Sequence, residues 1–160
     1  MADVFTKVLD VSEYLAHNDD GTVKVPVNLG PVLDKYGLSA YNVRFDGLPD
    51  VAGAFDRSEK AIYINETDPQ TRKIFTLAHE LGHYFLHSDV ERDVLFRERT
   101  MVGHREVIER EADCFAAEIL MPEAAIRKYW TVAESIQQMA DFFAVSYSAM
   151  RNRLRNLGFI

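Results

Sequence analysis

Apolar residues recur along this chain with two different periods, and each period predicts one kind of element. Spacings of three and four residues predict helices over residues 3–16, 28–36, 69–87, 107–120, 135–143 and 147–156. Alternation of apolar and polar residues predicts short strands over residues 41–46, 51–56 and 61–65. Together these elements predict an α+β fold that is mostly helical, with a small antiparallel or mixed three-stranded sheet.

Two regions of the pattern lead to narrower expectations. The first helix has one apolar face that we expect to be buried, made of Val4, Phe5, Val8, Leu9, Ser12 and Leu15. Residues 88–106 are polar and show little periodicity, so they are predicted to form a long loop beside any cleft.

The predicted helix over residues 69–87 is apolar except for one polar stripe. Asp68 and Pro69 have the residue types of an N-cap and a first helical position. At 100° per residue, the polar members fall within about a 100° arc, and they are Arg72, Thr76, His79, Glu80, His83 and His87. Unpaired polar groups in a core cost about 2 to 7 kcal/mol each in transfer terms. A metal ion would compensate for them, and the alternative is a solvated stripe on a surface helix.

His79, Glu80 and His83 form an H-E-x-x-H motif. Residues four apart lie on the same face of a helix, so both imidazoles can reach one metal ion while Glu80 stands beside the water that it binds. This is the layout of a zinc hydrolase in which Glu80 acts as the general base.

The third ligand has to come from elsewhere in the chain. His87 lies about 12 Å along the helix axis from His79, too far for three rings to converge on one ion. Phe85 and Asp89 occupy the positions where an extended motif would have glycine and a third histidine. A carboxylate from another element is therefore expected.

Residues 107–120 supply the candidate carboxylates. Their apolar spacing runs through Val107, Ile108, Ala112, Phe115 and Ile119. Glu111 projects into that face, where a carboxylate needs a cation, whereas Glu109 and Asp113 point roughly the opposite way. We therefore expect Glu111 to be the third ligand, with Glu118, two turns further on, as the competing choice.

Composition narrows the class of protein. With 160 residues, 48% of them hydrophobic, the chain can form a single domain over residues 1–160, with 133–160 as an integrated helical hairpin. The single cysteine, Cys114, excludes an intramolecular disulfide and is interpreted as a packed thiol. The N-terminus has no secretory apolar region, and no long apolar span occurs, so a cytoplasmic location without membrane contact is expected.

The two C-terminal helices have the rhythm of a helix-turn-helix, with a break at residues 144–146. Arg151, Arg153 and Arg155 on the second helix raise the alternative of DNA binding. The net charge of -7 opposes binding to phosphate, so packing or docking of a protein substrate is favoured.

Residues 79–87, HELGHYFLH, and residues 109–122, EREADCFAAEILMP, carry a family resemblance. With VPVNLGPVLDKYGL, VAGAFD, AIYIN and MADFFAVSYSAMRNRLRNLGF, they resemble the ImmA/IrrE family of metallo-endopeptidases over nearly the whole chain. The resemblance implies a zincin-like fold, a zinc ion held by His79, His83 and Glu111, and a catalytic Glu80. Phe115 stands four residues after Glu111, where the Glu-x-x-x-Asp pattern of thermolysin-like enzymes has aspartate.

Two functions from different classes follow. The first is a zinc endopeptidase that, as the resemblance implies, cleaves an Xre-type helix-turn-helix repressor and so derepresses mobile-element or stress genes. The second is a non-proteolytic regulatory module that keeps the metal site and acts by binding protein or DNA. For the protease, candidate oxyanion donors are Tyr63, His104 and Arg105, and an edge strand at residues 53–56 or 61–64 would align the peptide.

Overall fold

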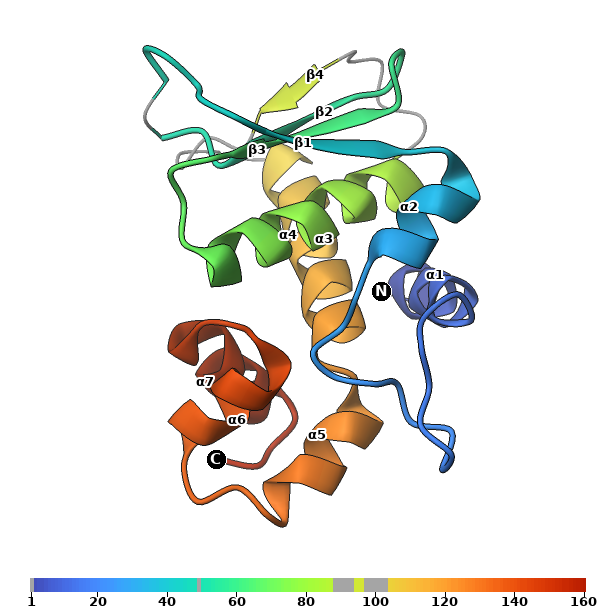
Figure 1. The fold of residues 1–160 in the computed structure, drawn as a ribbon, viewed down its shortest axis with the longest axis vertical. Coiled ribbons are helices and arrows are strands. Elements are labelled where there is room, and N and C mark those ends of the chain that lie inside the picture. The colour runs from blue at the N-terminus through green and yellow to red at the C-terminus, as the bar shows by residue number, and fades with distance from the viewer. Residues whose placement is uncertain (1, 49, 88–93, 97–103) are drawn as a thin grey trace.

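The computed structural model describes residues 2–48, 50–87, 94–96 and 104–160. Within these residues the helices are α1 (Ala2–Ser12), α2 (Gly30–Tyr36), α3 (Gln70–Leu86), α4 (His104–Leu120), α5 (Glu123–Trp130), α6 (Ile136–Phe143) and α7 (Tyr147–Asn156). The sheet lies at one end of the molecule and α5 to α7 at the other, and α4 runs between the two ends (Figure 1). The fold is mixed α and β, as predicted, although α5 was not among the predicted helices.

Four short strands form one mixed sheet in the order β1-β3-β2-β4. They are β1 (Ser39–Val43), β2 (Gly53–Asp56), β3 (Ala61–Asn65) and β4 (Val94–Phe96). β1 runs parallel to β3, whereas β2 runs antiparallel to both β3 and β4. The three predicted strands are present, and β4 falls inside the region predicted as a loop, most of which lies outside the described residues.

The sheet corrects two details of the prediction. β1 begins at Ser39 and is largely exposed, with Tyr41 at 50% exposure, and among the described elements its main contacts are with β3 and α2. β2 and β3 each pair with a strand on both sides, so their backbone groups are already bonded. Neither can be the edge strand that aligns a peptide.

Helix α3 packs beneath the sheet and carries the histidine motif (Figure 1). It spans Gln70–Leu86, one residue short at each end of the predicted range. Ile62 and Ile64 of β3 are buried, whereas Tyr63 between them stacks on exposed Tyr41, as alternation in a strand requires. One face of the sheet therefore closes over α3.

The first helix is shorter than predicted and buries a different face. It ends at Ser12, and Val4, Val11 and Leu15 are buried in or just after it. Phe5 and Leu9, predicted to be buried, are 45% and 68% exposed. The reason is that α1 packs on α3 and α4 through the face centred on Val4 and Val11, about a quarter turn away.

Of the C-terminal helices, α7 has the predicted bounds and α6 begins one residue later than predicted. Ser135 caps α6 and Ser146 caps α7, each through its side-chain oxygen. Ala144, between the helices, adopts the left-handed conformation at φ 52° that commonly ends a helix. Among the described helices, none is long and apolar enough to cross a bilayer.

Candidate metal centre

The motif residues of α3 lie in the interior of the protein. His79 is 0% exposed, and Glu80 and His83 are each 1% exposed. The two rings lie one helical turn apart and point the same way, with their Nε2 atoms 3.0 Å from each other. The predicted pairing of the two histidines is therefore present in the fold.

Glu109 of α4 completes a group with these histidines. Its Oε2 lies 3.2 Å from His79 Nε2, and its Oε1 lies 3.5 Å from His83 Nε2. One ligand atom from each of the three residues lies within 4.8 Å of the other two. In the part of the chain that the structure describes, this is the group of side chains with the spacing to hold a metal ion.

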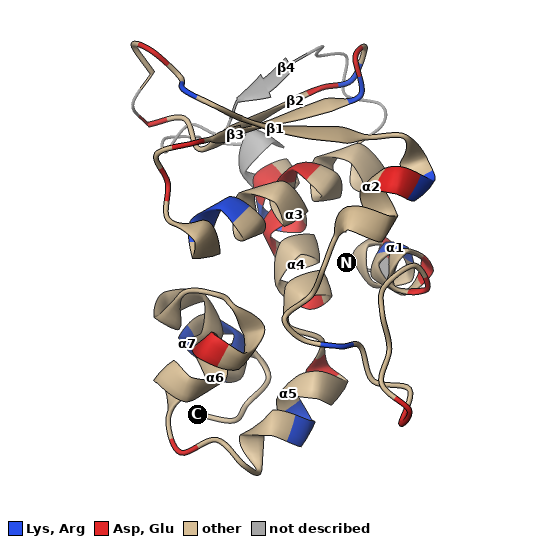
Figure 2. Cartoon of the chain, in the orientation of Figure 1, with Lys and Arg blue, Asp and Glu red and all other residues tan. Residues whose placement is uncertain are grey.

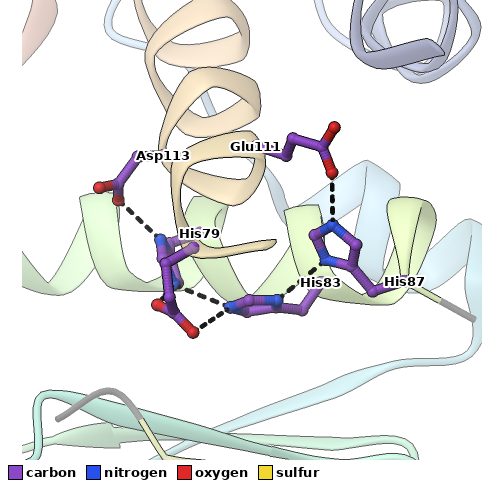
Figure 3. Close-up of polar contacts among 6 residues, drawn as sticks. His79, His83, His87, Glu111 and Asp113 are labelled. Atoms are coloured by element: carbon purple, nitrogen blue, oxygen red, sulfur yellow. Dashed lines mark hydrogen bonds and ion pairs between the residues drawn. The ribbon is translucent and has the colours of Figure 1, made fainter. Parts of the chain in front are cut away.

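Glu111, the predicted third ligand, does not join this group. Its Oε2 lies 3.1 Å from Nε2 of His87, beyond the end of α3, and its side chain is 36% exposed (Figure 3). The prediction assumed that the apolar face of α4 meets α3 with Glu111 in it. Val107, which anchored that assumption, is 49% exposed.

Small residues of α4 lie where it comes closest to α3. Ala112 and Ala116 are both 0% exposed and lie within about 60° of Glu109 around the helix. A Cβ atom on Gly82 of α3 would lie 2.9 Å from Cα of Ala112, so the two backbones nearly touch there. Glu109 lies one turn before this crossing and therefore faces His79 and His83.

Two features of the sequence signal Glu109. Small residues three and seven positions after it mark a close helix contact. Asp113 follows it at the fourth position, which restores the Glu-x-x-x-Asp spacing that Glu111 lacks. Figure 2 shows acidic positions gathered on both helices where α3 and α4 cross.

Asp113 orients His79. Its Oδ1 lies 2.8 Å from Nδ1 of His79. An ionised carboxylate only accepts hydrogen bonds, so Nδ1 of His79 donates and Nε2 of the neutral ring keeps its lone pair. That lone pair points toward His83 and Glu109, as a metal ligand requires.

The protonation states also suit a metal. Burial lowers the pKa of His83, partly offset by a hydrogen bond to Glu109, which favours the neutral ring. Burial alone would raise the pKa of Glu109, but hydrogen bonds and charge interactions with His79 and His83 outweigh it and hold this pKa below its ordinary value. A neutral imidazole and an ionised carboxylate are the forms that bind metal.

These residues fit a zinc ion. Two imidazole nitrogens and one carboxylate oxygen are a donor set used by catalytic zinc sites, which keep a further position open. Two buried Nε2 atoms 3.0 Å apart beside a carboxylate converge on one point, and a cation there would satisfy all three.

The remaining candidate residues have other partners. Glu118 makes a two-pronged ion pair with Arg153 of α7, at 2.5 and 2.7 Å, and so does not reach the histidines. Tyr63 donates a hydrogen bond to Glu59, which raises the pKa of its hydroxyl, and lies on the sheet face opposite α3. Cys114 is half-buried, and burial raises the pKa of its thiol. The side chains of His104 and Arg105 lie outside the described part of the structure.

Comparison with known proteins places this geometry in context. Residues 39–155 match the family model described as the IrrE N-terminal-like domain. The chain is 32% identical over 122 residues to the radiation response metalloprotease IrrE of Deinococcus radiodurans, covering 71% of this chain and 36% of that protein. It is 31% identical over 86 residues to the uncharacterized immunity region protein 2 of Bacillus phage phi105, covering 54% of this chain and 53% of that protein.

A solved structure shares the fold. It is a Mycobacterium tuberculosis transcriptional regulator, with a TM-score of 0.56 and 19% sequence identity, covering 92% of this chain and 40% of that one. This chain therefore spans about half or less of the length of the proteins that it matches.

Proposed function

The chain belongs to the ImmA/IrrE family, whose model covers most of its length, and on that premise we propose that it is a zinc-dependent endopeptidase with a zincin-like active site. The observation that carries the proposal is the convergence of His79, His83 and Glu109 at the buried crossing of α3 and α4. Glu80 lies next to His79 on the same helix and is 1% exposed.

The proposed ligands are His79, His83 and Glu109. Glu109 takes the place that the sequence had indicated for Glu111. Zinc bound by these residues would supply Lewis acidity toward a water molecule and a peptide carbonyl. Asp113 holds His79 in the tautomer that presents Nε2, so the site is arranged before any ion arrives.

Glu80 is the proposed general base. Its carboxylate would take a proton from the attacking water and pass that proton to the leaving amine. Gly53 of β2 lines this position, because a Cβ atom there would lie 3.3 Å from Oε1 of Glu80. The sheet thus forms one wall beside the catalytic carboxylate and limits where its side chain can move.

The proposed substrate is a protein, and specifically an Xre-type helix-turn-helix repressor or a related regulator. This substrate class is the one that the resemblance to the ImmA/IrrE family implies, and the relative from a Bacillus phage is described as an uncharacterized immunity region protein. The proposed location is the cytoplasm, where such a repressor acts.

A non-proteolytic module that binds DNA through α7 is the alternative. Arg153, one of the three arginines that raised it, is 5% exposed and held by Glu118, so it is not available to phosphates. Arg151 and Arg155 remain exposed. Two arginines on a chain of net charge -7 form too small a basic surface to favour DNA binding.

One experiment separates the two functions. The protein and its Glu80→Gln variant are incubated with an Xre-type repressor, with zinc or with a chelator, and fragments are mapped by mass spectrometry. We expect cleavage by the wild-type protein with zinc, and a variant that binds zinc without cleaving. A Glu80→Gln variant that binds zinc and still derepresses the target genes in cells as fully as the wild-type protein would support the non-proteolytic module.

A further inference from the structure

His87 lies at the end of α3, where the chain holds it at three points. Its backbone N–H donates to the carbonyl of His83 at 3.1 Å. Its own carbonyl accepts from Nη2 of Arg57 at 3.1 Å, and its ring Nε2 lies 3.1 Å from Oε2 of Glu111. The residue is 7% exposed. These contacts hold the ring in a defined orientation that helix geometry alone would not impose.

The other nitrogen of His87 points at the metal centre. Its Nδ1 lies 3.1 Å from Nδ1 of His83, so His79, His83, His87 and Glu111 form one chain of contacts (Figure 3). Between two neutral rings at this distance, one Nδ1 donates and the other accepts. The tautomer of His87 therefore decides the tautomer of His83.

Glu111 decides which nitrogen donates. An ionised carboxylate has no proton to give, so Nε2 of His87 carries the hydrogen and Nδ1 of the neutral ring is the acceptor. Nδ1 of His83 must then donate, which leaves its Nε2 with a lone pair toward His79 and Glu109. Asp113 sets the same tautomer of His79 by direct contact with its Nδ1.

We propose that Glu111 and His87 are positioning residues that set the tautomer of His83 for metal binding. The inference rests on the proposed function, because it gives these residues a role toward the same zinc ion. It assigns separate tasks to the three acidic residues of one stretch of α4: Glu109 is a ligand, Asp113 orients one histidine, and Glu111 orients the other through His87.

Zinc affinity tests the chain of contacts, measured by competition with a chromophoric chelator. His87→Leu removes the acceptor, and we expect affinity to fall about 10- to 100-fold, the usual loss for a partner of a ligating histidine. Asparagine has nearly the same shape as leucine but places an oxygen close to the position of Nδ1. His87→Asn should therefore keep most of the zinc affinity that His87→Leu loses. Equal affinities of the Leu variant and the wild-type protein would overturn the proposal.

A double-variant comparison tests whether Glu111 acts through His87. Glu111→Ala should weaken zinc binding in the wild-type background and have no further effect in the His87→Leu background. Glu111→Gln keeps an acceptor oxygen and should lose less zinc affinity than Glu111→Ala. Glu13 is an exposed glutamate away from the site, so Glu13→Ala serves as the control. An unchanged effect of Glu111→Ala in the His87→Leu background would show that Glu111 acts independently.

Nuclear magnetic resonance reads the tautomer directly. Long-range ¹H–¹⁵N spectra of the wild-type protein should show His87 protonated at Nε2 only, and a ring protonated at Nδ1 would overturn the inference. The measurement needs no substrate. If the wild-type protein bound no zinc, the proposed function would fail while the His87 tautomer would still decide this inference.

Discussion

Gly82 and Ala112 meet where α3 and α4 cross, at a separation that leaves no room for a side chain on α3. A Cβ atom at Gly82 would lie 2.9 Å from Cα and 3.1 Å from the carbonyl oxygen of Ala112. Both contacts are with backbone, so they cannot be relieved by a change of rotamer. This crossing is what carries Glu109 to His83, the residue that follows Gly82.

Gly82→Ala should push α3 and α4 apart. We expect the free energy of unfolding to fall by about 1 to 3 kcal/mol, the usual cost of overpacking a core, together with a loss of zinc affinity. Urea denaturation of the apo protein and chelator competition measure the two effects. The control is Gly37→Ala at the end of α2, which is strained at φ 65° but distant from the crossing, and should lower stability without changing zinc affinity.

Glu109→Ala should abolish stoichiometric zinc binding, because it removes one of the three convergent side chains proposed to hold the ion. Glu111→Ala should still bind one zinc ion per chain when zinc is in excess, although less tightly. Metal content after gel filtration in zinc-containing buffer, measured by plasma mass spectrometry, distinguishes the two variants. The reverse result would restore Glu111 as the ligand.

Gly53→Ala should disturb Glu80 more than the metal ligands. The added Cβ would overlap with Cγ2 of Thr76 and would lie 3.3 Å from Oε1 of Glu80. We expect cleavage to fall by a larger factor than zinc affinity. The overlap with Thr76 should also lower the stability of the Gly53→Ala variant. Thr76→Ser removes Cγ2, so the double variant should recover that stability. If it does not, the overlap with Thr76 is not the cause of the loss.

Arg153→Met should destabilise the protein by about 3 to 5 kcal/mol, because it leaves Glu118 with an unpaired charge in a poorly solvated position. Thermal or urea unfolding measures the loss. Arg151→Met, on an exposed position of the same helix, should change stability by less than about 0.5 kcal/mol. Similar effects of the two variants would mean that the ion pair contributes little.

Zinc should stabilise the native state. At a zinc concentration about 100 times the dissociation constant, the free energy of unfolding should rise by about 2.7 kcal/mol. Differential scanning fluorimetry with zinc or with a chelator measures this shift. The Glu109→Ala variant should show no shift, and a wild-type shift of the same size in that variant would point to a different site.

Apolar periodicity was sufficient to predict the bounds of those helices whose buried face is visible in their own sequence. Helices α3 and α6 were predicted to within one residue at each end, and α7 has the predicted bounds. The parallel pairing of β1 with β3 was not predictable, because antiparallel and parallel strands have the same alternation. The short α5 was not predicted, although it has as many residues as α6.

The H-E-x-x-H motif was determined by the sequence alone, because residues four apart share a helix face wherever the helix lies. Which carboxylate lies beside the two histidines was decided by tertiary structure. Glu109 and Glu111 lie about 160° apart around α4, and periodicity assigned the inner face to Glu111. The close crossing of Gly82 with Ala112 turned Glu109 inward and left Glu111 to pair with His87. Which side of a helix meets a neighbour depends on how closely two backbones approach, and that distance is a property of the pair of helices.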